Sequence, residues 1–149
     1  MFETGFQGSV QVLAEQLVVL NEDVILKYPS GILINKGVSE KKEVRLKKNS
    51  KVLGAVVVYD QDKSAHKIIK IDKKAEVVGD VFCSGKIQLT GKIIGTVYTS
   101  SFYLKTEAST YDNYIMNGMI DRKNLPNDFV RIPLFQHNHN RLYGAIKPM

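Results

Sequence analysis

A repeat with glycine at a fixed place most constrains the fold of this chain. VRL at 44–46 followed by VLGAV at 52–56 recurs 25 residues later, as IKI at 69–71 followed by VVGDV at 77–81. In a third copy IQL, 87–89, is displaced by 18 residues and IIGTV, 93–97, by 16. FYL at 102–104 is the candidate start of a fourth. Such repeats are typical of folds in which each unit stacks on its neighbours.

The spacing inside each copy predicts β-strands. Alternate residues are apolar, which is the period of a strand, and hairpin signals between the copies are lacking. Gly54, Gly79 and Gly95 hold equivalent places, where a side chain would obstruct a bend or a close backbone approach. We therefore expect an all-β fold, a single-stranded parallel β-helix (β-solenoid), in preference to a sandwich or barrel.

The 149 residues are expected to form a single β-solenoid domain, 1–149, with rungs in 1–106 and an irregular cap in 107–149. The cap contains Pro126, Pro133 and Pro148, and FVRIPLF, 129–135, is its strand candidate. The polar insertion VYDQDKSAHK, 58–67, lies where the next copy has only CSGK, as expected for a loop between rungs.

The first forty residues allow two interpretations. SVQVLAEQLVVL, 9–20, has apolar residues at helical spacing behind Ser9, a possible N-cap. DVILKYPSGILI, 23–34, has the pattern of two strands around a Pro-Ser-Gly turn. We favour strands throughout, since they extend the solenoid backwards.

Strand alternation places apolar side chains on the outside of the coil. If Val77 and Val81 point inward, their neighbours point outward. Terminal segments could cover these side chains, or another copy or a partner protein could contact them. The candidate assembly or interaction face comprises two columns: Leu53, Val78 and Ile94; Val57, Phe82 and Tyr98.

Basic residues form the second candidate surface. The net charge is +6 with a pI near 9.3, which favours anionic partners. Six basic residues and one acid give KKEVRLKKNSK, 41–51, a charge of +5, and the repeat sets its basic residues beside others about 4.8 Å away. This face is either solvated or bound to an anionic membrane surface or polymer; nucleic acid is disfavoured, because no recognition motif is visible. Its residues are Arg45, Lys47, Lys48, Lys70, Lys73 and Lys74.

Residues for catalysis or metal binding are sparse, so we expect no enzyme, no cofactor and no metal. Cys83 is the single cysteine, which excludes an intramolecular disulfide. His137 and His139 lack a nearby cysteine or carboxylate, and His66 lies in a lysine-rich insertion. Asp60 and Asp62, the one close carboxylate pair of the repeats, indicate a turn.

A solenoid enzyme is the alternative from another class, either acyltransferase or polysaccharide-acting. The six-residue step of Gly79, Gly85 and Gly91 is similar to hexapeptide acyltransferases, although Ser84 and Thr90 stand where that pattern requires an aliphatic residue. A glycan-cleaving β-helix would need clustered carboxylates. The longest apolar run, VLGAVVVY at 52–59, is too short for a membrane helix, and the N-terminus lacks a signal-peptide pattern.

The core GDVFCSGKIQLTGKIIGTVYTSSFYL resembles the bactofilin family of bacterial polymer-forming proteins, over about residues 44–106. The matching positions are Gly54, Gly79 and Gly95 with their flanking Val and Ile. The resemblance implies a right-handed parallel β-helix that stacks into filaments without nucleotide or metal. It also implies a cytoskeletal scaffold with itself or another protein as partner, in the bacterial cytoplasm or at the envelope membrane. The unequal turns and the cap-like end differ from that family and leave open a monomeric binding module of a larger envelope protein.

Overall fold

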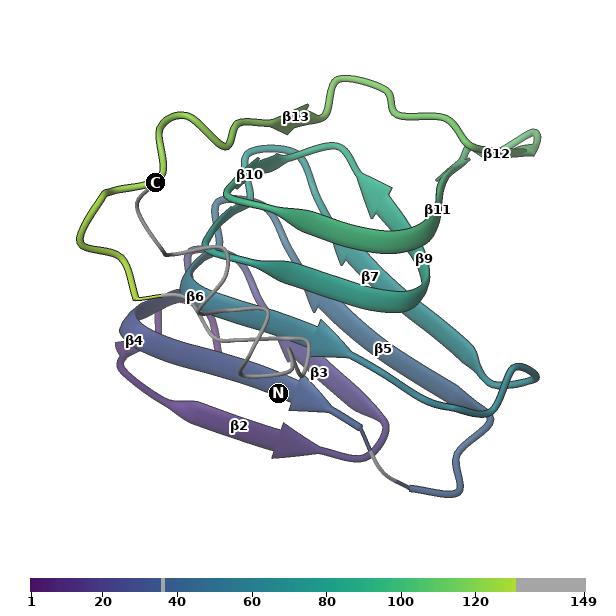
Figure 1. Ribbon diagram of the computed structural model, residues 1–149, viewed down its shortest axis with the longest axis horizontal. Coiled ribbons are helices and arrows are strands. Elements are labelled where there is room, and N and C mark those ends of the chain that lie inside the picture. The colour runs from purple at the N-terminus through teal and green to yellow at the C-terminus, as the bar shows by residue number, and fades with distance from the viewer. Residues whose placement is uncertain (36, 131–149) are drawn as a thin grey trace, which may run out of the picture.

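The computed structural model describes residues 1–35 and 37–130, which form thirteen β-strands and no helix. The chain coils into a solenoid-like, largely parallel sheet that is not closed into a barrel (Figure 1). Every strand pairing is parallel except that of β11 with β12. The strands are β1 (Gln7–Gly8), β2 (Gln11–Ala14), β3 (Leu17–Leu20), β4 (Ile25–Ile34), β5 (Lys41–Leu46), β6 (Lys51–Val58), β7 (His66–Ile71), β8 (Glu76–Val78), β9 (Val81–Leu89), β10 (Lys92–Ile94), β11 (Val97–Lys105), β12 (Thr110–Asp112) and β13 (Met119–Ile120).

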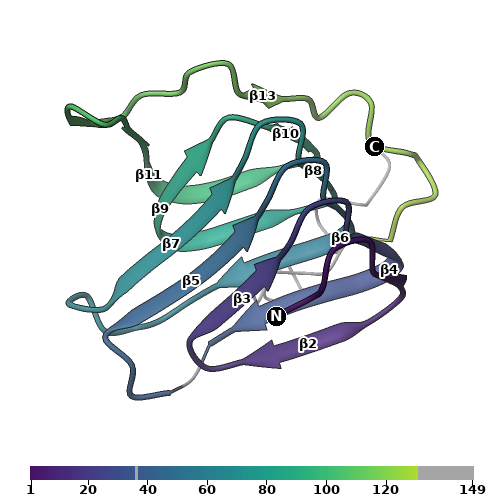
Figure 2. The ribbon, with the colours of Figure 1, turned by 180° about the vertical axis from the view of Figure 1, so that it is seen from behind.

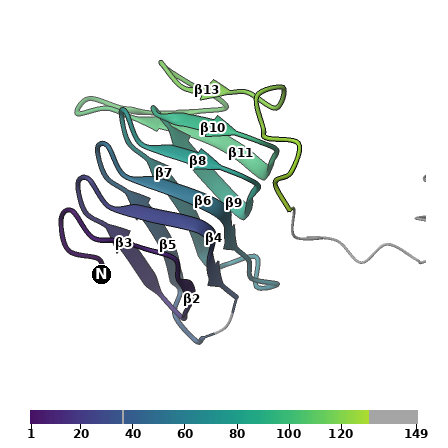
Figure 3. The same ribbon diagram turned by 90° about the vertical axis from the view of Figure 1, so that its left-hand side faces the viewer.

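Three faces result from this coiling, and we number them in chain order. Face 1 contains β1, β8, β10, β13 and the first residues of β4 and β6. Face 2 contains β2, the ends of β4 and β6, and the starts of β9 and β11. Face 3 contains β3, β5, β7, the end of β9 and the middle of β11, and Figure 2 shows it from behind. The chain crosses all three faces before it returns to the first (Figure 3).

The strand register confirms the repeat read from the sequence. Val44 pairs with Ile69, which pairs with Ile87, so the displacements of 25 and 18 residues are those of successive rungs. The other segments of the repeat, on faces 1 and 2, pair in the same way. Equivalent side chains therefore stack one above another along the coil.

The interior is a stack of aliphatic side chains from the inward positions of each strand. Val44, Leu46, Val56 and Ile69 are fully buried. Each such side chain contributes about 1.5–3 kcal/mol to stability through its removal from water. Because identical or similar residues lie above one another, β-branched side chains fill the interior, which explains the abundance of Val and Ile.

A column of glycines forms the corner between face 1 and face 2. Gly54, Gly79 and Gly95 have φ angles of +154°, +140° and +152°, in a region that residues with a Cβ rarely adopt. A Cβ on Gly79 would lie 1.8 Å from the carbonyl oxygen of Gly54, and one on Gly95 would lie 1.8 Å from that of Gly79. Glycine is required here both for the turn and for the close approach of successive rungs.

Both ends of the chain add to the coil. Residues 9–20 form β2 and β3, which confirms the favoured strand interpretation and shows that the helical one is wrong. After residue 106, β12 pairs with the end of β11, and β13 pairs with β10 and begins a further rung on face 1. The chain then descends along the corner between faces 1 and 2 (Figure 3), where the Phe129 ring lies 4.9 Å from that of Tyr28. Most of the strand candidate 129–135, with Pro133, Pro148, His137 and His139, lies outside the described residues.

Candidate functional site

The first apolar column lies on face 1, as the alternation indicates. Leu53 and Ile94 both pair with Val78 in the ladder, so the three side chains are neighbours. Val78 is buried, whereas Leu53 and Ile94 are half-buried. Phe129, in the segment after β13, lies beside the adjacent Gly79. The C-terminal segment therefore packs against the end of this column.

The second apolar column lies on face 2 and is longer than expected. Val57 pairs with Phe82, and Phe82 with Tyr98; the Phe82 and Tyr98 rings are 6.4 Å apart. The register continues this column to Leu33 and Leu13. Sequence reasoning missed these two residues, because rungs 1 and 2 do not share the 25-residue spacing. The column spans all five rungs, from Leu13 at one end to Tyr98 at the other.

The basic residues of face 3 are partly neutralised by one buried carboxylate. Arg45 and Lys70 are paired neighbours, as the repeat predicts, but both bind Glu43. Lys41 Nζ lies 2.9 Å from the same carboxylate. Burial raises the pKa of Glu43, yet the hydrogen bonds from Arg45, Lys41 and Lys70 outweigh burial and lower it to about 2. The expected repulsion between Arg45 and Lys70 is therefore relieved within the fold.

The remaining basic residues gather at the corner between faces 3 and 1. Two stacked turns carry them, since Asp72 N donates to Leu46 O in the rung below at 2.9 Å. The four side chains are exposed, and no carboxylate of the described residues forms an ion pair with them. This corner is the part of the predicted basic face with unneutralised charge: Lys47, Lys48, Lys73 and Lys74.

Two lysines point into the coil at the corner between faces 2 and 3. Lys42 and Lys67 are ladder neighbours at positions where the alternation directs the side chain inward. Lys42 is fully buried, and its ammonium contacts Asp60 Oδ2 at 2.8 Å, Gly37 O at 3.0 Å and Ser39 O at 3.2 Å. The period-two pattern that starts at Lys42 could have indicated this, but we assigned lysine to the surface by type.

The two ends of the coil differ. At the start, β2 pairs on one side with β4, and among the described residues no strand lies on its other side. At the finish, β13 covers β10 and β12 covers the end of β11. Leu13 in β2 is 79% exposed. The first rung therefore presents an open strand edge with an apolar side chain.

The groups with potential chemistry lie apart from one another. Cys83 is buried, and desolvation raises the pKa of its thiol to about 11, which disfavours the reactive thiolate. His66 is exposed, and Asp60 and Asp62 shape a turn in which Asp62 N donates to Asp60 Oδ1. Within 1–35 and 37–130, no three His, Cys, Asp or Glu side chains are grouped as a metal site would require. The same residues contain no helix long and apolar enough to cross a membrane.

Comparison with known proteins identified no relative. No family model matches the chain, and neither a curated protein nor a solved structure matches it.

Proposed function

We propose that this protein is a non-catalytic structural protein that assembles with copies of itself through the first rung of its coil. The observation that supports this is the asymmetry of the two ends. A strand edge left open at one end of a sheet is a template for pairing with another chain. Natural solenoids that stay monomeric cover such ends with capping segments, and here β12 and β13 do so only at the far end.

The backbone of β2 is oriented for such pairing. Val10 O accepts a hydrogen bond from Gly31 N at 3.0 Å, so the groups that face β4 alternate along the strand. The N–H and C=O groups of Gln11 and Leu13 consequently face away from β4. Leu13 and Leu17 flank this edge and are both exposed. Pairing would bury apolar surface and satisfy backbone groups together.

The coil in this proposal is a right-handed, single-stranded parallel β-helix, as in the bactofilin family that the repeat resembles. The assembly would act as a scaffold in the bacterial cytoplasm or at the envelope. The lysine corner of Lys47, Lys48, Lys73 and Lys74 would contact an anionic surface or polymer, because its charge is not balanced within the described part of the fold.

Sedimentation velocity and negative-stain electron microscopy over a range of concentrations test self-assembly. We expect dimers or longer particles in the wild type and monomers in Leu13→Lys, since a charge on the edge opposes pairing. Val38→Lys is the matched control: it adds the same charge at a fully exposed position in the loop before β5. Circular dichroism and urea denaturation check that both variants fold.

Two results would count against the proposal. Monomeric wild type at every concentration would exclude self-assembly by this chain. Assembly that persists in Leu13→Lys but disappears in Tyr98→Lys would move the contact from the open end to the apolar column of face 2.

A further inference from the structure

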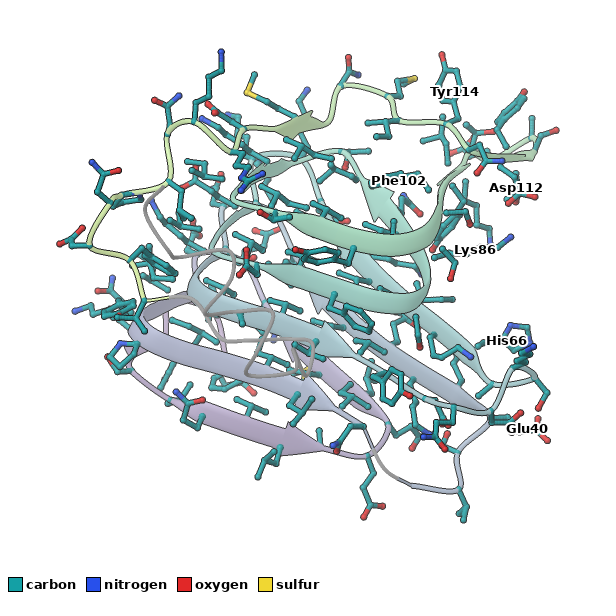
Figure 4. All side chains as sticks on the ribbon, in the orientation of Figure 1. Glu40, His66, Lys86, Phe102, Asp112 and Tyr114 are labelled. Carbon is teal, nitrogen blue, oxygen red and sulfur yellow. The ribbon has the colours of Figure 1, made fainter. Side chains whose placement is uncertain are left out.

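A cleft of about 330 Å³ lies at the corner between faces 2 and 3, away from the open end. Three chain segments form it, namely 63–68, 84–86 and 100–101, which belong to three successive rungs. Its lining contains three lysines, one histidine and four serines, and no aspartate or glutamate. Figure 4 shows His66 and Lys86 along this edge of the molecule, with Asp112 above them. A concave site with cations and without carboxylates favours an anionic ligand.

The hydrogen-bond donors of the cleft narrow the ligand. Three serine hydroxyls already donate within the protein: Ser64 to Asp62 Oδ1, Ser84 to Asp60 O, and Ser100 to Ser84 O. Ser101 donates to no acceptor of the described residues through its hydroxyl. The donors left for a ligand are this hydroxyl, the imidazole of His66 and the lysine ammonium groups.

Lys67 supplies an independent argument. Its side chain is only 7% exposed, and its ammonium donates to Asp62 O at 2.5 Å. No carboxylate of the described residues lies within 4.0 Å of it. Its ladder neighbour Lys42 has two carbonyls and the Asp60 carboxylate as acceptors. An ammonium has three donors, so a buried one with a single acceptor and no counter-charge is stabilised by a nearby anion.

Lys86 is also available to a ligand. It pairs with Asp112 at 2.7 Å, but both side chains are at least half exposed. Such a pair contributes about 0–1 kcal/mol, so an anion in the cleft competes with Asp112 at small cost. Lysine ammonium groups bind phosphate as point charges, without the planar geometry that arginine imposes on its partners.

We infer that this cleft binds the phosphate group of a phosphorylated small molecule or lipid headgroup. The cleft is within the size range of small-molecule sites, which leaves room for an organic group attached to the phosphate. The site lies on the side of the coil and does not depend on assembly through β2.

A titration monitored by NMR amide shifts at low salt tests this inference. The probes are inorganic phosphate and a hexose 6-phosphate, with the unphosphorylated hexose as the neutral control. We expect saturable shifts confined to residues 63–68, 84–86 and 100–101 with both phosphates and none with the hexose. Vesicles of phosphatidylcholine with and without phosphatidic acid separate a lipid source from a soluble one: either hexose phosphate or phosphatidic acid binding at this cleft supports the site.

Matched double variants test whether the cleft, and not net charge, binds the ligand. Lys63→Gln with Lys86→Gln should weaken hexose phosphate binding about tenfold or more, since two charge-assisted contacts are lost. Lys73→Gln with Lys74→Gln removes the same charge at the distant lysine corner and should change affinity less than about twofold. Equal losses in the two double variants would overturn the inference, as would the absence of binding by every phosphate probe.

Discussion

Replacement of Gly79 by alanine tests whether close rung contact at the glycine corner holds the coil together. Gly79 has a φ of +140°, and an alanine there carries about 1–3 kcal/mol of backbone strain. Its Cβ would also lie 1.8 Å from Gly54 O, whereas a carbon contact is ordinarily roughly 3.5 Å or more. The two rungs must therefore separate at this corner.

That separation has a cost that the structure allows us to work out. Gly79 N donates to Ile94 O at 2.8 Å, and Val56 N donates to Asp80 O at 3.0 Å, so one hydrogen bond lies on each side of the corner. Weakening both adds about 1 kcal/mol each. Together with the strain, we expect Gly79→Ala to lower the free energy of unfolding by about 3–5 kcal/mol, a large part of the 5–15 kcal/mol typical of a domain.

Urea denaturation followed by circular dichroism measures this change, with Gly5→Ala as the control. Gly5 also has a positive φ, +78°, but a Cβ there would meet no atom within 4 Å. The control should lose only about 1 kcal/mol, from backbone strain without overlap. If the two variants differ by less than about 1 kcal/mol, contact between rungs is not the reason for glycine at this corner.

Three further outcomes follow from individual side chains. Glu43 has a pKa of about 2 in the fold against 4.5 ordinarily, so its stabilisation is complete above pH 4.5 and is lost as the pH falls towards 2. Because its partners Lys41 and Arg45 are partly exposed, we expect roughly 2 kcal/mol of acid-sensitive stability in urea titrations at several pH values, and a weaker pH dependence over this window in Glu43→Gln. Lys42→Met should lower the free energy of unfolding by about 2–4 kcal/mol because the buried ammonium loses three acceptors, whereas exposed Lys27→Met should change it by less than about 0.5 kcal/mol; equal values would contradict the role of Lys42. Cys83 should react with a thiol reagent only after unfolding, in step with the urea transition, and rapid labelling of folded protein would show that the thiol is accessible.

Most of the solenoid-like fold could be predicted because its signals are local. A period of two and a glycine at a fixed place describe one rung, and rungs that repeat the same pattern pair with one another in register. The partners of Val44, Val52 and Val56 therefore followed from the spacing of 25 residues, and the columns of Val78 and Phe82 followed from the same register.

The first rungs were harder to predict for the same reason. Leu13 pairs with Leu33 twenty residues later, and Leu33 pairs with Val57 after 24. With unequal turns, no single displacement aligns these copies. The apolar column on face 2 was therefore recognised over only three of its five rungs.

By itself, the sequence determined the strand period, the stacking of rungs and the need for glycine at one corner, because these depend on the backbone and on neighbouring residues. Only the tertiary structure decided which charges are balanced. Glu43 binds lysines and an arginine from two rungs, Lys42 turns inward to Asp60 in another loop, and Lys63 and Lys86 share a cleft across insertions of different length. Electrostatic partners depend on distances in space of a few ångströms, and a sequence with variable loops does not specify those distances.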